Sequence, residues 1–173
     1  MGKNMFALLM SVCVIGLSGC ASIPKNATVV EGFDVTRYMG TWYEIARFDF
    51  RFERGLDHTT AEYALNADNT VKVVNRGYNP QKDVWKEAKG KARFRGTSDK
   101  GALEVSFFGP FYAGYNILAL EDYRYALVCG SSTKYLWILS REKTIPEEVR
   151  KQFLKIASDA GFPTSDLIWV NQE

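Results

Sequence analysis

From residue 40 onward, short runs rich in Tyr, Val, Phe, Trp and Thr are separated by clusters of turn residues. Runs of this composition are typical of β-strands, and their spacing is that of a sandwich or a barrel. The pattern predicts eight strands, at about residues 41–48, 58–66, 70–78, 84–95, 102–108, 112–120, 124–130 and 134–141. Because the connections are short, we expect an up-and-down antiparallel meander that closes on itself and leaves no free edge.

One segment near the C-terminus has helical periodicity instead. Thr144 is a candidate cap, Pro146 fits the first turn, and Gly161 is a typical helix end. An eight-stranded barrel has no room for a helix inside, so we expect this helix to pack on the outer wall, with a short ninth strand at 167–170 after it. Its expected buried face consists of Val149, Phe153, Ile156, Ala157 and Ala160.

Composition fits one globular domain. The 173 residues are 46% hydrophobic and 14% aromatic, which excludes a disordered or collagen-like chain. The net charge of +2 is spread along the chain and gives no electrostatic support to nucleic-acid binding. A barrel of eight strands is filled by its own side chains or holds one small ligand, and composition does not choose between the two.

The N-terminus reads as a targeting segment. Residues 5–17 are apolar but too few to cross a bilayer, which indicates a signal peptide. The following Leu17-Ser18-Gly19-Cys20 resembles the lipobox of bacterial lipoproteins, which implies cleavage before Cys20 and its acylation with chains such as palmitate. Ala21 and Ser22 then imply sorting to the outer membrane, with the domain facing the periplasm. We expect a signal peptide at 1–19, a lipidated Cys and polar tether at 20–33, and the domain at 34–173.

The sequence from Gly40 to Arg47, GTWYEIAR, resembles the first signature of the lipocalins. The resemblance is strengthened by Glu121-Asp122-Tyr123 at a late turn, where Thr is usual in place of Glu121, and by Leu139-Ser140-Arg141 in the last strand. It covers about residues 33–171 and points to the bacterial outer-membrane lipocalins, which are similar to apolipoprotein D. It implies an all-β fold: an eight-stranded antiparallel up-and-down barrel, one C-terminal α-helix packed outside and a short ninth strand, with a short helix at 34–38 under the barrel.

The resemblance also implies a barrel floor made of Gly40, Trp42 and Arg141. Trp42 closes the floor, and the Arg141 guanidinium lies across its indole in a cation–π contact worth about 0.5–2 kcal/mol. The family's inward-facing positions, carried over one at a time, obey the two-residue period of a strand. They are the expected ligand-binding residues Ala61, Tyr63, Val73, Asn75, Ala88, Val105, Phe107, Asn116, Leu118, Ala126, Val128, Tyr135 and Trp137.

The function implied by this resemblance is storage or transport of a hydrophobic molecule such as a fatty acid, a lysophospholipid or a related lipid. Each buried CH₂ of an acyl tail contributes about 0.8 kcal/mol, so a tail alone can supply micromolar affinity. Four cations expected at the open end can meet an anionic headgroup, although each alone also fits an ordinary surface charge: Arg51, Arg54, Lys82 and Lys134.

Other functions stay open at this point. An enzymatic lipocalin would need chemistry that one His and one domain cysteine supply poorly, and strand parity places Cys129 outside the barrel. A structural envelope lipoprotein with a filled barrel is the other alternative. A homodimer is also possible, through an apolar patch made of residues 109–112 and exposed Phe48, Phe50 and Phe52. No cofactor and no metal site are expected.

Overall fold

A computed structural model describes residues 22–173 of the chain. The expected signal peptide and Cys20 lie outside the described residues. No helix in the described part is long and apolar enough to cross a bilayer.

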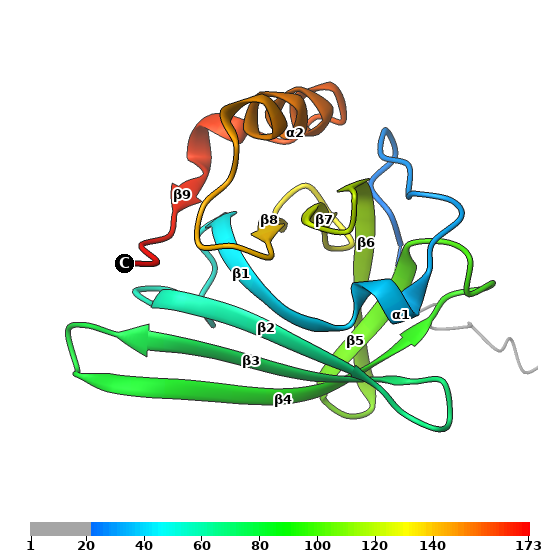
Figure 1. The fold of residues 1–173 in the computed structure, drawn as a ribbon, viewed down its shortest axis with the longest axis horizontal. Helices are drawn as coiled ribbons and strands as arrows, with labels where there is room; N and C mark the ends of the chain where they lie inside the picture. Colours follow the sequence, from blue (N-terminus) through cyan, green and yellow to red (C-terminus); the bar gives the residue numbers. More distant parts are fainter. Residues whose placement is uncertain (1–21) are drawn as a thin grey trace, which may run out of the picture.

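The described residues form a closed antiparallel barrel, as the alternating pattern predicts (Figure 1). Each strand pairs with the next along the chain, and β1 closes the barrel by pairing with both β8 and β2. The short β9, Ile168–Trp169, pairs with β1 on the outside. The eight barrel strands are β1 (Gly40–Arg47), β2 (Asp57–Leu65), β3 (Val71–Asn79), β4 (Val84–Phe94), β5 (Ala102–Phe108), β6 (Phe111–Glu121), β7 (Tyr125–Cys129) and β8 (Leu136–Ser140).

The two ends of this barrel differ. The connections β1–β2, β3–β4, β5–β6 and β7–β8 lie at one end, called the open end below. The short helix α1 (Val35–Tyr38) and the remaining turns lie at the other end, called the floor. Figure 1 shows α1 on the right and the long β3–β4 hairpin reaching to the left.

Strand alternation sorts the apolar side chains into two clusters. The inner cluster lies inside the barrel and includes Trp42, Tyr63 and Val128. The outer cluster lies between the barrel wall and the C-terminal helix and includes Leu127 and Phe153. Register shifts occur in four of the described strands. Those between residues 44 and 46 in β1 and between 117 and 119 in β6 place two successive residues on the same side.

The C-terminal helix α2, Glu147–Asp159, packs on β6 outside the barrel, as expected. Phe153 and Ala157 are its fully buried residues. Its start differs from the prediction: Pro146 is the N-cap residue, with no side-chain cap, and the Thr144 carbonyl instead accepts a hydrogen bond from Ser140 Oγ at 2.8 Å. Thr144 lies two residues before the N-cap position, too early to cap the first turn. Gly161 follows the helix at φ +86°, a conformation that favours glycine.

Residues 22–33, expected to be a polar tether, pack along the barrel wall. The Val30 N–H donates to the Ile117 carbonyl at 2.9 Å, and Ala27 is buried in the outer cluster. Phe33 reaches the inner cluster from the floor, where it meets the Tyr38 ring edge-on at 5.3 Å. The segment runs from Ser22, which contacts β6, to α1.

Candidate functional site: the barrel interior

The floor has the geometry that the sequence predicts. Trp42 is fully buried, and the Arg141 guanidinium carbon lies 3.9 Å from its ring centroid. Arg141 also donates hydrogen bonds to the carbonyls of Thr41 and Met39, each at 2.8 Å. Gly40 has φ +94°, and a Cβ there would lie 3.4 Å from Arg141 Nη1, so the backbone needs glycine at this point. These contacts join the first and last strands beneath the barrel.

Three tyrosine hydroxyls meet just above the floor. The Tyr38 and Tyr63 hydroxyls each bond to that of Tyr115, at 2.7 and 3.0 Å. Burial raises the pKa of all three phenols above the ordinary value, so they stay neutral and can donate hydrogen bonds. Tyr115 was missed by the sequence analysis, which placed the even-numbered residues of β6 inside.

That parity prediction for β6 is wrong. Leu118 belongs to the outer cluster, whereas Ile117 belongs to the inner one. Asn116 also lies on the outer face, where its Nδ2 donates to the Gly130 carbonyl at 3.0 Å and its Oδ1 accepts from Arg95. Tyr115, Ile117 and Leu120 face inward, because the bulge at residues 117–119 adds one residue to the usual two-residue spacing. No residue pattern in the sequence indicates this change of spacing. Neither Asn116 nor Leu118 can touch a ligand inside the barrel.

The other expected lining residues face the interior, and along most strands their exposure increases toward the open end. Val128 is an exception, because it is fully buried although it pairs with half-buried Trp137. Val73, Ala126 and Val128 are buried in the inner cluster with Tyr63. Higher up, the lining is half-buried or exposed, in a wall made of Ala61, Asn75, Ala88, Val105, Phe107 and Trp137. Side chains that point inward and yet remain accessible show that the barrel is filled below and open above.

Aromatic rings stand at the open end beside Trp137. Tyr135 stacks on the Trp137 indole with centroids 6.3 Å apart, and Phe50 packs against it edge-on at 5.4 Å. Tyr135 lies just before β8, outside the strand in which it was expected. Of the three phenylalanines expected to be exposed, Phe52 is exposed and Phe50 half-buried, but Phe48 is buried in the outer cluster near Phe162.

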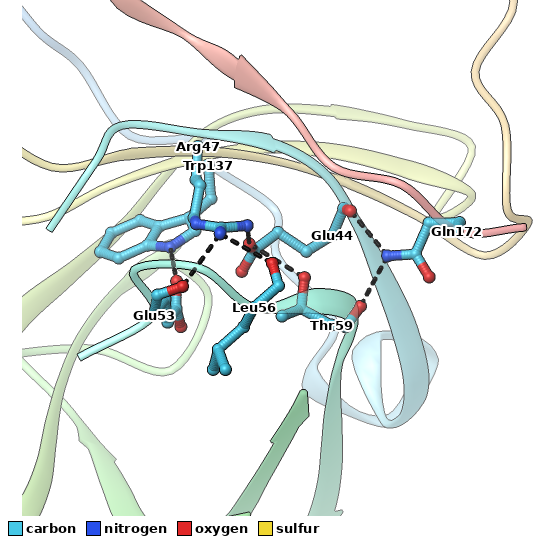
Figure 2. Close-up of polar contacts among 7 residues, drawn as sticks. All are labelled: Glu44, Arg47, Glu53, Leu56, Thr59, Trp137 and Gln172. Atoms are coloured by element: carbon cyan, nitrogen blue, oxygen red, sulfur yellow. Dashed lines mark hydrogen bonds and ion pairs between the residues drawn. The ribbon is translucent and has the colours of Figure 1, made fainter. Parts of the chain in front are cut away.

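A polar network lies inside the barrel below this aromatic group (Figure 2). Arg47 and Glu44, both buried, form an ion pair at 2.8 Å. Arg47 Nη2 also donates to the carbonyls of Glu53 and Leu56, each at 2.9 Å, which ties the β1–β2 loop to the barrel. Thr59 Oγ1 donates to Glu44 Oε1 at 3.1 Å. The pair therefore neutralises its own charges and holds the loop over the open end.

The third ionisable member of the network is Glu53, on the loop itself. Its Oε2 accepts a hydrogen bond from Trp137 Nε1 at 3.2 Å. Burial raises the pKa of Glu53 well above the ordinary value, and the charge of Glu44 raises it further. Burial also raises the pKa of Glu44, against the opposing effect of Arg47. Arg47 thus pairs with the Glu44 carboxylate, and the proton prefers Glu53.

The sequence analysis did not identify this network. Glu44 and Arg47 differ by an odd number of positions, so strict alternation would place them on opposite faces. The bulge after Glu44 puts Ile45 and Ala46 on the outside together and returns Arg47 to the interior. The sequence did contain a signal for this ion pair: a Glu and an Arg lie three residues apart inside an apolar strand. Buried charges are normally paired, so the two side chains could have been expected to meet.

Asn75 has a buried polar atom without a hydrogen-bond partner among the described residues. This atom is Oδ1, and the side chain faces the interior beside Ala61. Such an unpaired acceptor is costly in a dry interior.

Cys129 lies outside the barrel, as strand parity predicts. It is fully buried in the outer cluster, and burial raises the pKa of its thiol to about 12. A thiol with this pKa is a poor nucleophile at neutral pH. The expected headgroup cations Arg51, Arg54, Lys82 and Lys134 lie exposed on loops of the open end, where Arg54 pairs with Asp49 at 3.0 Å.

A cup closed at one end by a tryptophan and an arginine, with an aromatic and partly accessible interior, defines a calyx-type binding protein. The chain matches the model of the lipocalin-like domain over residues 33–172, and it belongs to that family. It is 57% identical over 150 residues to the outer membrane lipoprotein Blc of Citrobacter freundii, covering 86% of this chain and 85% of the relative. It is 32% identical over 165 residues to apolipoprotein D of Mus musculus, covering 90% and 84%. Insecticyanin of Manduca sexta shares the fold, with a TM-score of 0.71 at 24% identity over 87% and 86% of the two chains.

Proposed function

We propose that the protein binds a single-chain lipid, a fatty acid or a lysophospholipid, in its barrel and stores or carries it at the outer membrane. Family membership supports binding of a hydrophobic ligand in general. The observation that carries the finer proposal is the graded interior, in which the expected lining becomes more accessible toward the open end along most strands. An apolar wall whose side chains become more accessible toward the open end suits one acyl chain.

The polar groups suggest how such a lipid is oriented. The acyl tail enters first and lies against Val105 and Phe107, where each buried CH₂ adds about 0.8 kcal/mol. The headgroup stays at the open end, near the exposed cations Arg51 and Lys134. A tail-first pose avoids placing an anionic head against the carboxyl groups of Glu44 and Glu53.

We also propose that acylated Cys20 holds the domain at the outer membrane, on the periplasmic side. The lipobox-like Leu17-Ser18-Gly19-Cys20 supports this anchor, and so does the name of the 57% identical relative. Two or more acyl chains give firm attachment, whereas one gives only reversible binding. A protein fixed beside the bilayer has the lipids of that bilayer, single-chain lipids among them, as its nearest apolar ligands.

Binding rather than catalysis is the activity that we propose for the interior. Cys129, the thiol within the domain, lies outside the barrel with a raised pKa. The interior carboxyl groups are engaged with Arg47 and Trp137. These contacts give the groups a structural role and favour a binding site.

The test is saturable uptake of a fluorescent long-chain acyl probe by the purified, delipidated protein. Trp137→Ala removes a large part of the interior wall and should weaken binding about tenfold. Trp169→Ala is the matched control, because Trp169 lies on β9 outside the barrel. The proposal fails if the wild-type protein shows no saturable uptake, or if the two variants weaken binding equally.

A further inference from the structure

The loops of the open end carry most of the exposed large apolar side chains. Phe52, Trp85, Phe108 and Phe111 are 63%, 62%, 73% and 78% exposed. Val84 and Tyr135 at the same end are also exposed. At the floor, Leu65 is the only exposed large apolar side chain among the described residues. Apolar residues gathered on one rim usually mark a contact surface.

Basic side chains accompany these rings. The Arg51 guanidinium carbon lies 4.9 Å from the Phe52 ring centroid, and Lys82 and Lys134 are exposed on neighbouring loops. Of the acidic residues of the β1–β2 loop, Asp49 pairs with Arg54 and Glu53 bonds to Trp137. Aromatic rings with surrounding Lys and Arg are the composition that binds the interface of an anionic bilayer.

The described chain begins near this same rim. Asn116 Nδ2 donates to the Ser22 carbonyl at 3.3 Å, and Ser22 Oγ donates to the Ser131 carbonyl at 3.4 Å. Cys20 precedes Ser22 by two residues, a reach of at most about 7 Å. Ser22, the first described residue, thus lies close to Gly114, where a Cβ would be 2.9 Å from the Ser22 carbonyl oxygen.

Distances along β6 then decide which end of the barrel can meet the membrane. Gly114 is three residues from Phe111 at the open end, about 10 Å along the strand. It is seven residues from Glu121 at the floor, about 24 Å away. A reach of about 7 Å from Ser22 covers most of the distance to the rim but less than a third of the distance to the floor, so the anchor favours contact of the rim with the bilayer.

We propose that the open end docks face-on against the membrane that holds Cys20, with Phe108 and Phe111 inserted at the lipid interface. The barrel then opens directly onto the bilayer, and a single-chain lipid passes between membrane and interior without crossing water. This inference rests on the proposed lipid binding and anchoring, and it adds an orientation that neither requires.

The experiment places a reporter at each end of the full-length lipidated protein in vesicles. Phe111→Cys carries a nitrobenzoxadiazole (NBD) label at the rim, and Ser98→Cys is the matched control on an exposed floor turn. The protein without an added cysteine measures background labelling of buried Cys129. The vesicles contain phosphatidylethanolamine, phosphatidylglycerol and brominated phosphatidylcholine. We expect brominated lipid to quench the rim label and aqueous iodide to quench the floor label.

Two other outcomes overturn the orientation. If iodide quenches both labels, the open end faces the periplasm. If the rim label is protected from iodide but brominated lipid does not quench it, a second copy of the chain covers the rim. Uptake of the soluble acyl probe, measured on the same samples, reports the proposed function separately, so docking and binding can fail independently.

A second measurement tests transfer. Phe108→Ser combined with Phe111→Ser should slow uptake of a probe supplied in vesicles about tenfold, because the rim loses its interfacial anchors. Uptake of the same probe from solution should change less than about twofold, since neither residue lies in the inner cluster. Equal rates of vesicle uptake for the variant and the wild type would contradict docking.

Discussion

Replacement of Arg47 by Met tests whether the interior ion pair is structural. The guanidinium and the Glu44 carboxylate lie 2.8 Å apart with side-chain exposures of 3% and 8%. Removing one member of such a buried pair leaves an uncompensated charge and typically costs about 3–5 kcal/mol. The carbonyls of Glu53 and Leu56 lose their donor as well. We expect Arg47→Met to lower the free energy of unfolding by about 4 kcal/mol.

A double-mutant cycle separates the charge effect from the lost hydrogen bonds. In Glu44→Gln/Arg47→Met no charge is buried, but the two loop carbonyls still lack a donor, so we expect a cost of about 2 kcal/mol. Urea unfolding of the wild type, both single variants and the double variant, at one pH, gives the coupling energy. The reasoning is refuted if Arg47→Met costs less than about 1 kcal/mol, or if the cost of the double variant equals the sum of the single costs.

Three further predictions concern the floor, the loop carboxyl and the outer thiol. Arg141→Lys should cost about 2–3 kcal/mol in urea unfolding, because lysine cannot keep the indole contact and all the carbonyl bonds together; a cost below about 0.5 kcal/mol would contradict the floor's role. The raised pKa of Glu53 favours the protonated acid in the fold, so its contribution is complete below the ordinary value of 4.5 and is lost as the pH rises through the folded value. The melting temperature of the wild type should therefore fall relative to that of Glu53→Gln between about pH 5 and 8, and parallel profiles would argue against this. Native Cys129 should react with iodoacetamide far more slowly than the unfolded chain, as followed by mass spectrometry; equal rates would mean an accessible thiol.

Much of the architecture could be predicted because it depends on local repetition. Eight alternating runs with short turns indicate a closed meander, and the structure confirms the strands to within about two residues at most boundaries. The amphipathic segment around Phe153 forms a helix on the outer wall. The floor residues Gly40, Trp42 and Arg141 could also be predicted, since the signature that carries them is contiguous in sequence.

The lining was predictable on regular strands and not on bulged ones. Tyr63, Val73 and Val128 face inward because nothing interrupts the two-residue period between them and the floor. Asn116 and Leu118 were misplaced because the bulge in β6 changes which residues face inward. A bulge arises from the pairing of two strands, and one strand's sequence does not display it.

The sequence by itself determined the number of strands, the direction of their apolar faces and the residues that close the floor, because these follow from periodicity and from one short motif. Only the tertiary structure brought Glu53 of a loop to Glu44 and Arg47 of β1, and the Tyr38 hydroxyl to that of Tyr115. Residues distant in sequence meet only when the barrel closes, since loop path, bulge position and burial are properties of the packed fold.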